Sequence, residues 1–115
     1  MTRKELIGVL TQWQSGERDE LAIWEWAAES VEARQANGPD ADELVRDIMD
    51  LLGALPYEMV IVDDLPVFLD ALENPLEETD LSINLLWNHM DAVDVDTRRL
   101  QHAEHPFYGQ FTHAD

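Results

Sequence analysis

Glycine and proline residues divide this chain into short segments, and that division constrains the fold more than any other feature of the sequence. The breaks fall at Ser15-Gly16, Asn37-Gly38-Pro39, Pro56, Asn74-Pro75 and His105-Pro106. Between the breaks, apolar residues recur three and four positions apart, which is the spacing of one face of an α-helix. The sequence therefore predicts several short helices joined by tight connections.

Two helices are expected before residue 37. Thr2 and Glu5 have the spacing of an N-terminal capping box, and the helix that follows is predicted to end at Ser15-Gly16. A second helix is predicted from about Glu17 to Ala36. Its apolar stripe contains Leu21, Trp24, Ala28 and Val31, and Trp26 widens that stripe.

Acidic residues stand near the start of each later segment, where a carboxylate can cap a helix N-terminus. The third helix is predicted to end at Pro56 and the fourth at Asn74-Pro75. A fifth helix is expected over about 77–91, and a short sixth helix is closed by His105-Pro106. The capping candidates are Asp40 with Glu43, Asp63 or Asp64, and Asp94 or Asp96.

Two segments lack helical periodicity. Residues 57–62 have the β-branched content of a strand, but a lone strand has no partner here, so an extended, buried connector is expected. At the C-terminus, Phe107, Tyr108 and Phe111 surround Gly109. We expect these rings to fold back and plug the open end of the bundle. The alternative is an exposed aromatic patch for a partner, which would be an aggregation hazard in a monomer.

These segments together predict an all-α fold with one domain over residues 1–115. Its arrangement is expected to be a compact bundle or orthogonal array of five to six helices, with the aromatic C-terminal tail packed back on it. The apolar fraction of 45% is that of a globular protein. No run approaches the ~20 apolar residues of a membrane span. The chain has no cysteine, which fits a reducing compartment, and we expect a cytoplasmic protein.

The net charge of −18 is the most unusual property of the composition. It arises from 25 acidic residues against seven basic ones, and Lys4 is the single lysine. Such a charge repels nucleic acid and anionic lipid and attracts basic surfaces. Direct binding to a nucleic-acid backbone is therefore not expected, because that requires lysine and arginine to displace counterions. The expected partner is a basic protein surface.

The negative charge is concentrated in the middle of the chain. Residues 47–97 contain 13 acidic residues and no lysine or arginine. We predict that part of this span forms a docking face. Trp26 has Glu25 and Glu29 near it on its own helix, and we expect it either to pack in the core or to serve as a partly exposed anchor of the interface. The candidate partner-binding residues are Asp47, Asp50, Asp63, Asp64, Asp70, Glu73, Glu77, Glu78, Asp80 and Trp26.

The acidity can also arise in three ways that need no docking face. Several acidic residues can serve as helix caps, which would make them local structural elements. An organism adapted to salt would have an acidic proteome, and every protein in it would look like this one. The chain could also be an adaptor or subunit whose charge only keeps it soluble.

Histidines are the candidates for acid–base or metal chemistry. His102 and His105 are three residues apart and can share a helical face, with Glu104 and Asp91 as further ligands; His89 and His113 complete the set. Pro106 places His105 at or beyond a helix end. No phosphate-binding glycine loop and no nucleophile elbow is found. The sequence thus favours a non-enzymatic protein without a metal or cofactor, and a small enzyme that uses these histidines is the alternative.

Both ends of the chain resemble small acidic bacterial proteins. The resemblance rests on Glu5-Leu6-Ile7 through Trp13, on Ser15-Gly16-Glu17, on Trp24-Glu25-Trp26-Ala27 and on Pro106-Phe107-Tyr108-Gly109-Gln110-Phe111. Some of these proteins are similar to immunity proteins of the colicin and contact-dependent inhibition type, which neutralise a cognate nuclease toxin. The resemblance implies a helical protein with a toxin as its partner. It assigns no individual residue.

Overall fold

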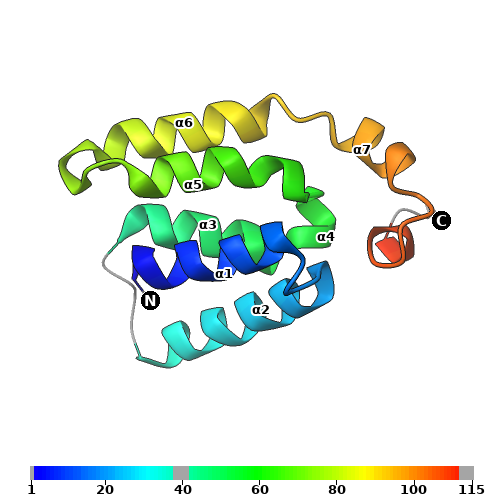
Figure 1. Ribbon diagram of the computed structural model, residues 1–115, viewed down its shortest axis with the longest axis horizontal. Helices are drawn as coiled ribbons and strands as arrows, with labels where there is room; N and C mark the ends of the chain where they lie inside the picture. The colour runs from blue at the N-terminus through cyan, green and yellow to red at the C-terminus, as the bar shows by residue number, and fades with distance from the viewer. Residues whose placement is uncertain (1, 38–41, 112–115) are drawn as a thin grey trace.

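The computed structural model describes residues 2–37 and 42–111, and helices form most of both ranges (Figure 1). No strand occurs in these residues, so the all-α prediction is confirmed. The α-helices are α1 (Arg3–Ser15), α2 (Glu20–Asn37), α3 (Glu43–Gly53), α4 (Leu55–Glu58), α5 (Leu65–Glu73), α6 (Thr79–Asp91) and α7 (Val95–Gln101). Three short 3₁₀ helices are η1 (Val62–Asp64), η2 (Leu76–Glu78) and η3 (Tyr108–Phe111).

The ends of α1 confirm the predicted capping chemistry. The hydroxyl of Thr2 accepts a hydrogen bond from the backbone N–H of Glu5 at 3.1 Å. At the other end, Gly16 adopts the left-handed conformation with φ of 88°. The N–H groups of Gly16 and Glu17 then reach the carbonyls of Trp13 and Gln12. This pattern is a Schellman motif, which needs a residue that tolerates positive φ.

Aspartates cap three of the later helices. Asp19 accepts from the N–H of Ala22, so α2 begins at Glu20 and not near Glu17 as the sequence suggested. Asp42 caps α3, whereas the predicted cap Asp40 lies outside the described residues. Asp94 caps α7, as predicted. In each case a carboxylate pairs with a donor that the first helical turn leaves unsatisfied.

The segment from 54 to 64 differs from the prediction. Pro56 was expected to end a helix, but it occupies the first turn of α4, where its missing N–H costs no hydrogen bond. Tyr57 and Glu58 are therefore helical, and only Val60 and Ile61 match the predicted buried connector. The left-handed backbone of Met59, with φ of 52°, makes the turn between the two parts.

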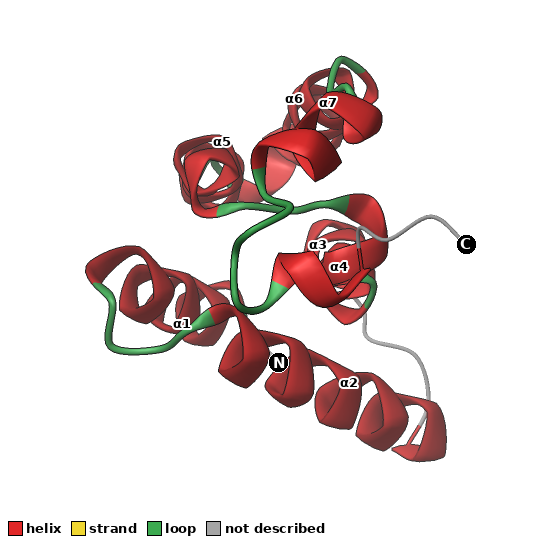
Figure 2. Ribbon diagram, turned by 90° about the vertical axis from the view of Figure 1, so that its right-hand side faces the viewer, coloured by secondary structure: helices red, strands yellow, loops and turns green. Residues whose placement is uncertain are grey.

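The core is centred on α3, which contacts α2, α5 and α6. Its buried residues are Leu44, Val45, Ile48, Met49, Leu51 and Leu52. Helix α1 adds Leu6, Leu10 and Trp13, and it packs against α5. Helices α5 and α6 form an antiparallel pair on one side of α3, and α2 lies on the other side (Figures 1 and 2). No helix in the described ranges has the length and apolarity of a bilayer span.

The aromatic tail packs back on the helices, as predicted. Phe107 and Tyr108 are buried, and the Phe107 ring makes an edge contact with Trp24 at 5.6 Å between centroids. The hydroxyl of Tyr108 donates to the carbonyl of Val60, which ties the tail to the connector. Burial raises the pKa of Tyr108, and the negative charges of Glu20 and Asp64 raise it further, so this hydroxyl stays protonated. The side chain of Phe111 lies outside the described part of the chain.

Candidate functional site

Five of the predicted partner-binding residues gather where α5 turns into α6, at the left of Figure 1. We call them the acidic corner: Asp70, Glu73, Glu77, Glu78 and Asp80. All five are exposed. Leu76, in the middle of this turn, is 69% exposed, and Leu81, which follows Asp80 in α6, is 55% exposed. The corner thus combines carboxylates with accessible apolar side chains.

The acidic corner continues onto the start of α3. Asp42, Glu43, Leu76, Thr79 and Asp80 line a hollow of about 430 Å³ between the two parts. From the sequence, Glu43 was expected only as part of a cap, but it is exposed and lines this hollow together with Asp80. An extended side chain from a partner would meet the negative charge of both residues there.

Arg3 and Asn74 hold the turn of the acidic corner in place. Arg3 donates to the carboxylate of Asp42 at 2.8 Å, to the carbonyl of Asn74 at 3.1 Å and to the hydroxyl of Thr79 at 2.9 Å. The side-chain amide of Asn74 donates to the buried Ser82 at 3.1 Å. The backbone that carries the carboxylates is therefore braced from three helices.

The carboxylates of the acidic corner make no side-chain capping hydrogen bond in the described residues, although Asp80 lies in the first turn of α6, where the helix dipole favours a negative charge. The side-chain caps come from Thr2, Asp19, Asp42 and Asp94, while the residue before α6, Glu78, makes no capping hydrogen bond. The corner also forms no ion pair within the described ranges. The ion pairs there join Arg3 to Asp42 and Arg98 to Asp64, and the rings of His89 and His105 contact Asp64 and Glu20. Helix capping therefore does not explain this cluster.

The other predicted residues lie apart from the acidic corner. Asp47 and Asp50 are on α3, and Asp47 accepts from the indole N–H of Trp87 at 3.0 Å. Asp63 is exposed at the opposite end of α5. Trp26 is half-buried against the core on α2, on the far side of α3 from α6 (Figure 2). The structure therefore does not place Trp26 among the carboxylates of the corner.

Asp64 corrects the predicted docking face, because its side chain is completely buried. Arg98 binds it with two hydrogen bonds of 2.7 and 2.8 Å, and the ring of His89 lies 2.6 Å from it. The backbone N–H of Ile61 donates to the same carboxylate at 3.0 Å. Arg98 also donates to the carbonyl of Met59. Asp64 thus joins η1, α6 and α7, and no partner can reach it.

The environment of Asp64 favours its charged form. Burial by itself raises the pKa of a carboxyl group, but hydrogen bonds from Arg98, Ile61 and His89 and the charge of Arg98 outweigh burial. The pKa of Asp64 therefore lies below its ordinary value. The pKa of Asp42 is lowered in the same way, with Arg3 and the first N–H groups of α3 opposing the effect of burial.

Among the described residues, His89, His102 and His105 do not come together with a third metal-ligating side chain. His89 is committed to Asp64, and His113 lies outside the described residues. No group of three metal-ligating side chains occurs among the residues that the structure describes. His102 and His105 do approach each other, with 6.3 Å between ring centroids. Both nitrogens of His105 are occupied, however: Nε2 faces Glu20 at 3.0 Å, and Nδ1 accepts from the N–H groups of Phe107 and Tyr108.

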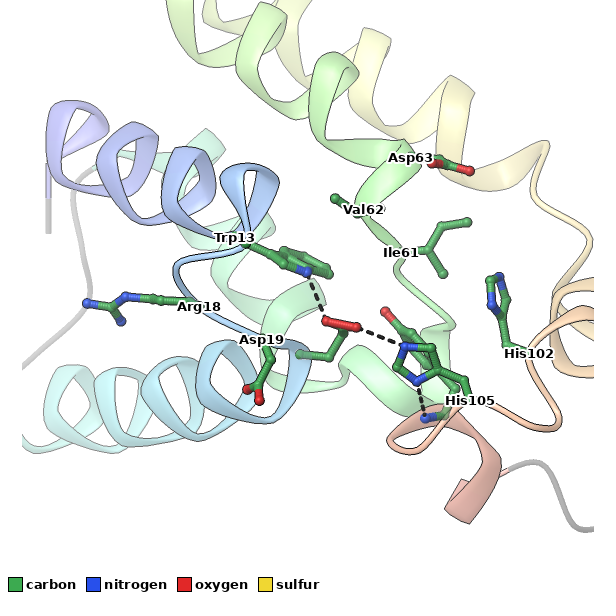
Figure 3. Close-up of a pocket in the computed structure, with 11 residues that line it drawn as sticks. Trp13, Arg18, Asp19, Ile61, Val62, Asp63, His102 and His105 are labelled. Carbon is green, nitrogen blue, oxygen red and sulfur yellow. Dashed lines mark hydrogen bonds and ion pairs between the residues drawn. The ribbon is translucent and has the colours of Figure 1, made fainter.

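A second hollow lies around Glu20, at the other end of the molecule (Figure 3). It has a volume of about 340 Å³. Its lining comes from the junction of α1 with α2, from the connector before α5, and from the tail. It contains aromatic, carboxylate and imidazole groups, and nothing in the sequence suggested that these segments would meet.

Comparisons with protein-family models, with curated proteins and with solved structures find no match to this chain.

Proposed function

We propose that this protein binds a basic protein surface through the acidic corner, and that it inhibits a nuclease in the manner of an immunity protein. One observation carries the proposal. The five carboxylates of the corner are exposed and neither cap a helix nor pair with a cation in the described residues. Uncompensated charges of one sign repel each other and destabilise the folded chain. A partner that neutralises them removes this repulsion, which favours binding.

The exposed leucines favour a protein as the partner. Leu76 and Leu81 stand among the carboxylates with more than half of their surface exposed, at 69% and 55%. Apolar contacts surrounded by charge complementarity are typical of protein–protein interfaces, in which the apolar groups supply affinity and the charges supply rate and selectivity. A small inorganic cation would have no use for these leucines.

A nuclease is the partner that best fits this surface. An enzyme that cleaves nucleic acid holds the phosphate backbone with lysine and arginine side chains. A braced row of carboxylates can occupy those side chains by imitating the charge of the backbone. The resemblance of the chain ends to immunity proteins agrees with this role, and it implies that the partner is a cognate toxin.

Capture from a lysate of the source organism tests the proposal. The tagged protein is used as bait at about 50 mM and about 500 mM salt, because screening shortens the range of surface charge over this interval. We expect a basic protein to be retained at low salt and released at high salt. The captured protein should cleave nucleic acid, and added bait should inhibit that cleavage.

Two charge-matched variants decide whether the acidic corner is responsible. One converts Asp70, Glu73, Glu77, Glu78 and Asp80 to the corresponding amides. The control converts five exposed acidic residues elsewhere, namely Glu17, Glu25, Glu29, Asp96 and Glu104. Both variants lose five negative charges. We expect only the corner variant to lose capture and inhibition. Equal losses in both variants, or no basic protein retained at low salt, would contradict the proposal.

A further inference from the structure

The second hollow, which we call the Glu20 pocket, lies at the opposite end of the molecule from the acidic corner (Figures 1 and 3). Its volume of about 340 Å³ is within the range of small-molecule sites. The residues that line the pocket include Trp13, Ile61, Val62, His102, His105 and Tyr108. The carboxylate of Glu20 lies between Trp13 and His105 (Figure 3).

Two neutral donors fix the carboxylate of Glu20. The indole N–H of Trp13 donates to Oε2 at 3.2 Å, and Nε2 of His105 lies 3.0 Å from Oε1. Because Nδ1 of His105 accepts two backbone N–H groups, its single proton belongs on Nε2, and the ring donates to Glu20 without carrying a charge. The negative charge of Glu20 is therefore oriented but not neutralised.

The remaining groups near the pocket do not neutralise Glu20 either. Arg18 stands at the rim, where its Nε donates to the side chain of Gln12 at 2.6 Å, and Figure 3 shows its guanidinium group extending away from Glu20. Asp19 and Asp63 add negative charge at the rim. The pocket therefore carries net negative charge.

The imidazoles of His102 and His105 supply the accessible flat surfaces of the pocket, because Trp13 and Tyr108 are only 3% and 2% exposed. Tyr108 is packed against His105 with 4.8 Å between ring centroids, and against His102 with 5.4 Å. The imidazole of His102 makes no hydrogen bond within the described residues and can accept one from a bound molecule. A carboxylate with free lone pairs beside partly exposed, flat imidazole rings suits a flat organic cation, because the carboxylate accepts its N–H groups and the rings give its body a surface to lie on.

We propose that the Glu20 pocket binds a flat organic cation of the amidinium or guanidinium class. The cation's N–H groups would donate to Glu20, and its planar body would lie against the partly exposed imidazoles of His102 and His105. A guanidinium group can belong to a free small molecule or to an arginine side chain of a protein. This pocket is separate from the acidic corner, and the proposal does not depend on nuclease inhibition.

Titration of the ¹⁵N-labelled protein with benzamidinium tests the proposal. The indole N–H of Trp13 should shift and saturate because it shares the carboxylate with the ligand. The indole N–H of Trp87 is bonded to Asp47 and should not move. Benzamide has the same shape without the charge, and benzoate has the opposite charge. Both should bind at least tenfold more weakly. Blocked arginine, N-acetyl-arginine methylamide, distinguishes the sources: its binding indicates an arginine side chain as the natural ligand, and its exclusion indicates a free molecule.

Two variants with the same change in charge separate a pocket from general attraction to an acidic protein. Glu20→Gln should weaken benzamidinium binding at least tenfold, and Glu73→Gln in the acidic corner should leave it unchanged. Circular dichroism checks that both variants are folded. If Glu20→Gln does not fold, the ligand series on the unaltered protein still decides the matter. Equal binding of benzamide and benzamidinium, equal effects of the two variants, or no shift at Trp13 would overturn the proposal.

Discussion

Replacing Asp64 with asparagine removes the charge that holds three elements of this fold together. The carboxylate receives hydrogen bonds from Arg98 and from the N–H of Ile61, and it faces the ring of His89. Asparagine has the same shape, but its amide nitrogen would face donors and not acceptors. Arg98 would remain in place with one of its three described hydrogen bonds lost.

The expected cost follows from the burial of the pair. Removing one partner of a buried ion pair destabilises a protein by about 3–5 kcal/mol, because the other charge stays buried without compensation. Asp64 is fully buried, whereas the side chain of Arg98 is 15% exposed and can recover some hydration. We therefore expect a value at the lower end, about 3 kcal/mol. With a urea m-value of about 1.5 kcal/mol per molar, the midpoint of unfolding should fall by about 2 M.

Urea denaturation followed by tryptophan fluorescence measures this change, and the neighbouring residue supplies the control. Asp63 is exposed, and Asp63→Asn makes the same chemical change one residue away. The control should alter the free energy of unfolding by no more than about 0.5 kcal/mol. If Asp64→Asn is as stable as Asp63→Asn, the carboxylate does not hold α7 and α6 to the connector, and the reasoning is wrong.

The same comparison has a defined dependence on pH. The pKa of Asp64 is lower in the folded chain than its ordinary value of 3.8. Such a group contributes stability above its unfolded-state pKa and loses that contribution as the pH falls through its folded-state pKa. The difference in stability between the wild-type protein and Asp64→Asn should therefore be full at pH 6 and shrink below about pH 4.

Three further predictions concern stability alone. Gly8→Ala should raise the free energy of unfolding by about 0.5–1 kcal/mol, since Gly8 is inside α1 and a Cβ there meets nothing within 4 Å. Gly109→Ala should lower the free energy of unfolding by about 1–3 kcal/mol, because the new Cβ would lie 2.6 Å from the carbonyl oxygen of Ala103. Thermal melts of the two glycine variants check both signs. A stabilised Gly109→Ala would contradict the packing of the tail. Arg3→Met should lower the free energy of unfolding, measured in urea, by about 2 kcal/mol, because Asp42 loses a charge-assisted hydrogen bond. Equal stability of the variant and the wild-type protein would show that Arg3 does not brace the acidic corner.

The local elements of the fold were predictable because their causes are local in sequence. The cap formed by Thr2, the left-handed Gly16 and the cap formed by Asp94 each depend on residues within three or four positions. Helical periodicity likewise identified α1, α3, α5 and α6 in outline. The start of α2 was misplaced because Glu17 and Asp19 are both acidic residues that suit a helix start, and it is the carboxylate of Asp19 that makes the cap.

The long-range contacts were not predictable from one sequence. Asp64 and Asp63 are identical neighbours in a helix-starting context, and only the tertiary fold buries one and exposes the other. The partner that decides the matter, Arg98, is 34 residues away. Pro56 was ambiguous for a similar reason, since proline both ends one helix and begins the next. The Glu20 pocket joins Trp13 to His105 across most of the chain, and no local pattern relates them.

The positions of the few basic residues explain why the carboxylates of the acidic corner have no cationic partner in the described residues. Two arginines near the acid-rich helices already form ion pairs within the fold, Arg3 with Asp42 and Arg98 with Asp64. Both pairs stabilise carboxylates that are at least partly withdrawn from water, where an unpaired charge is most costly. The exposed carboxylates of the corner are left without such partners in the described residues because water can hydrate them. Their mutual repulsion is tolerable in a folded chain that hydrogen bonds from Arg3 and Asn74 brace at that turn, and the proposed basic partner would relieve it. A protein that needed its acidity only for solubility would gain nothing from concentrating five carboxylates around an exposed leucine.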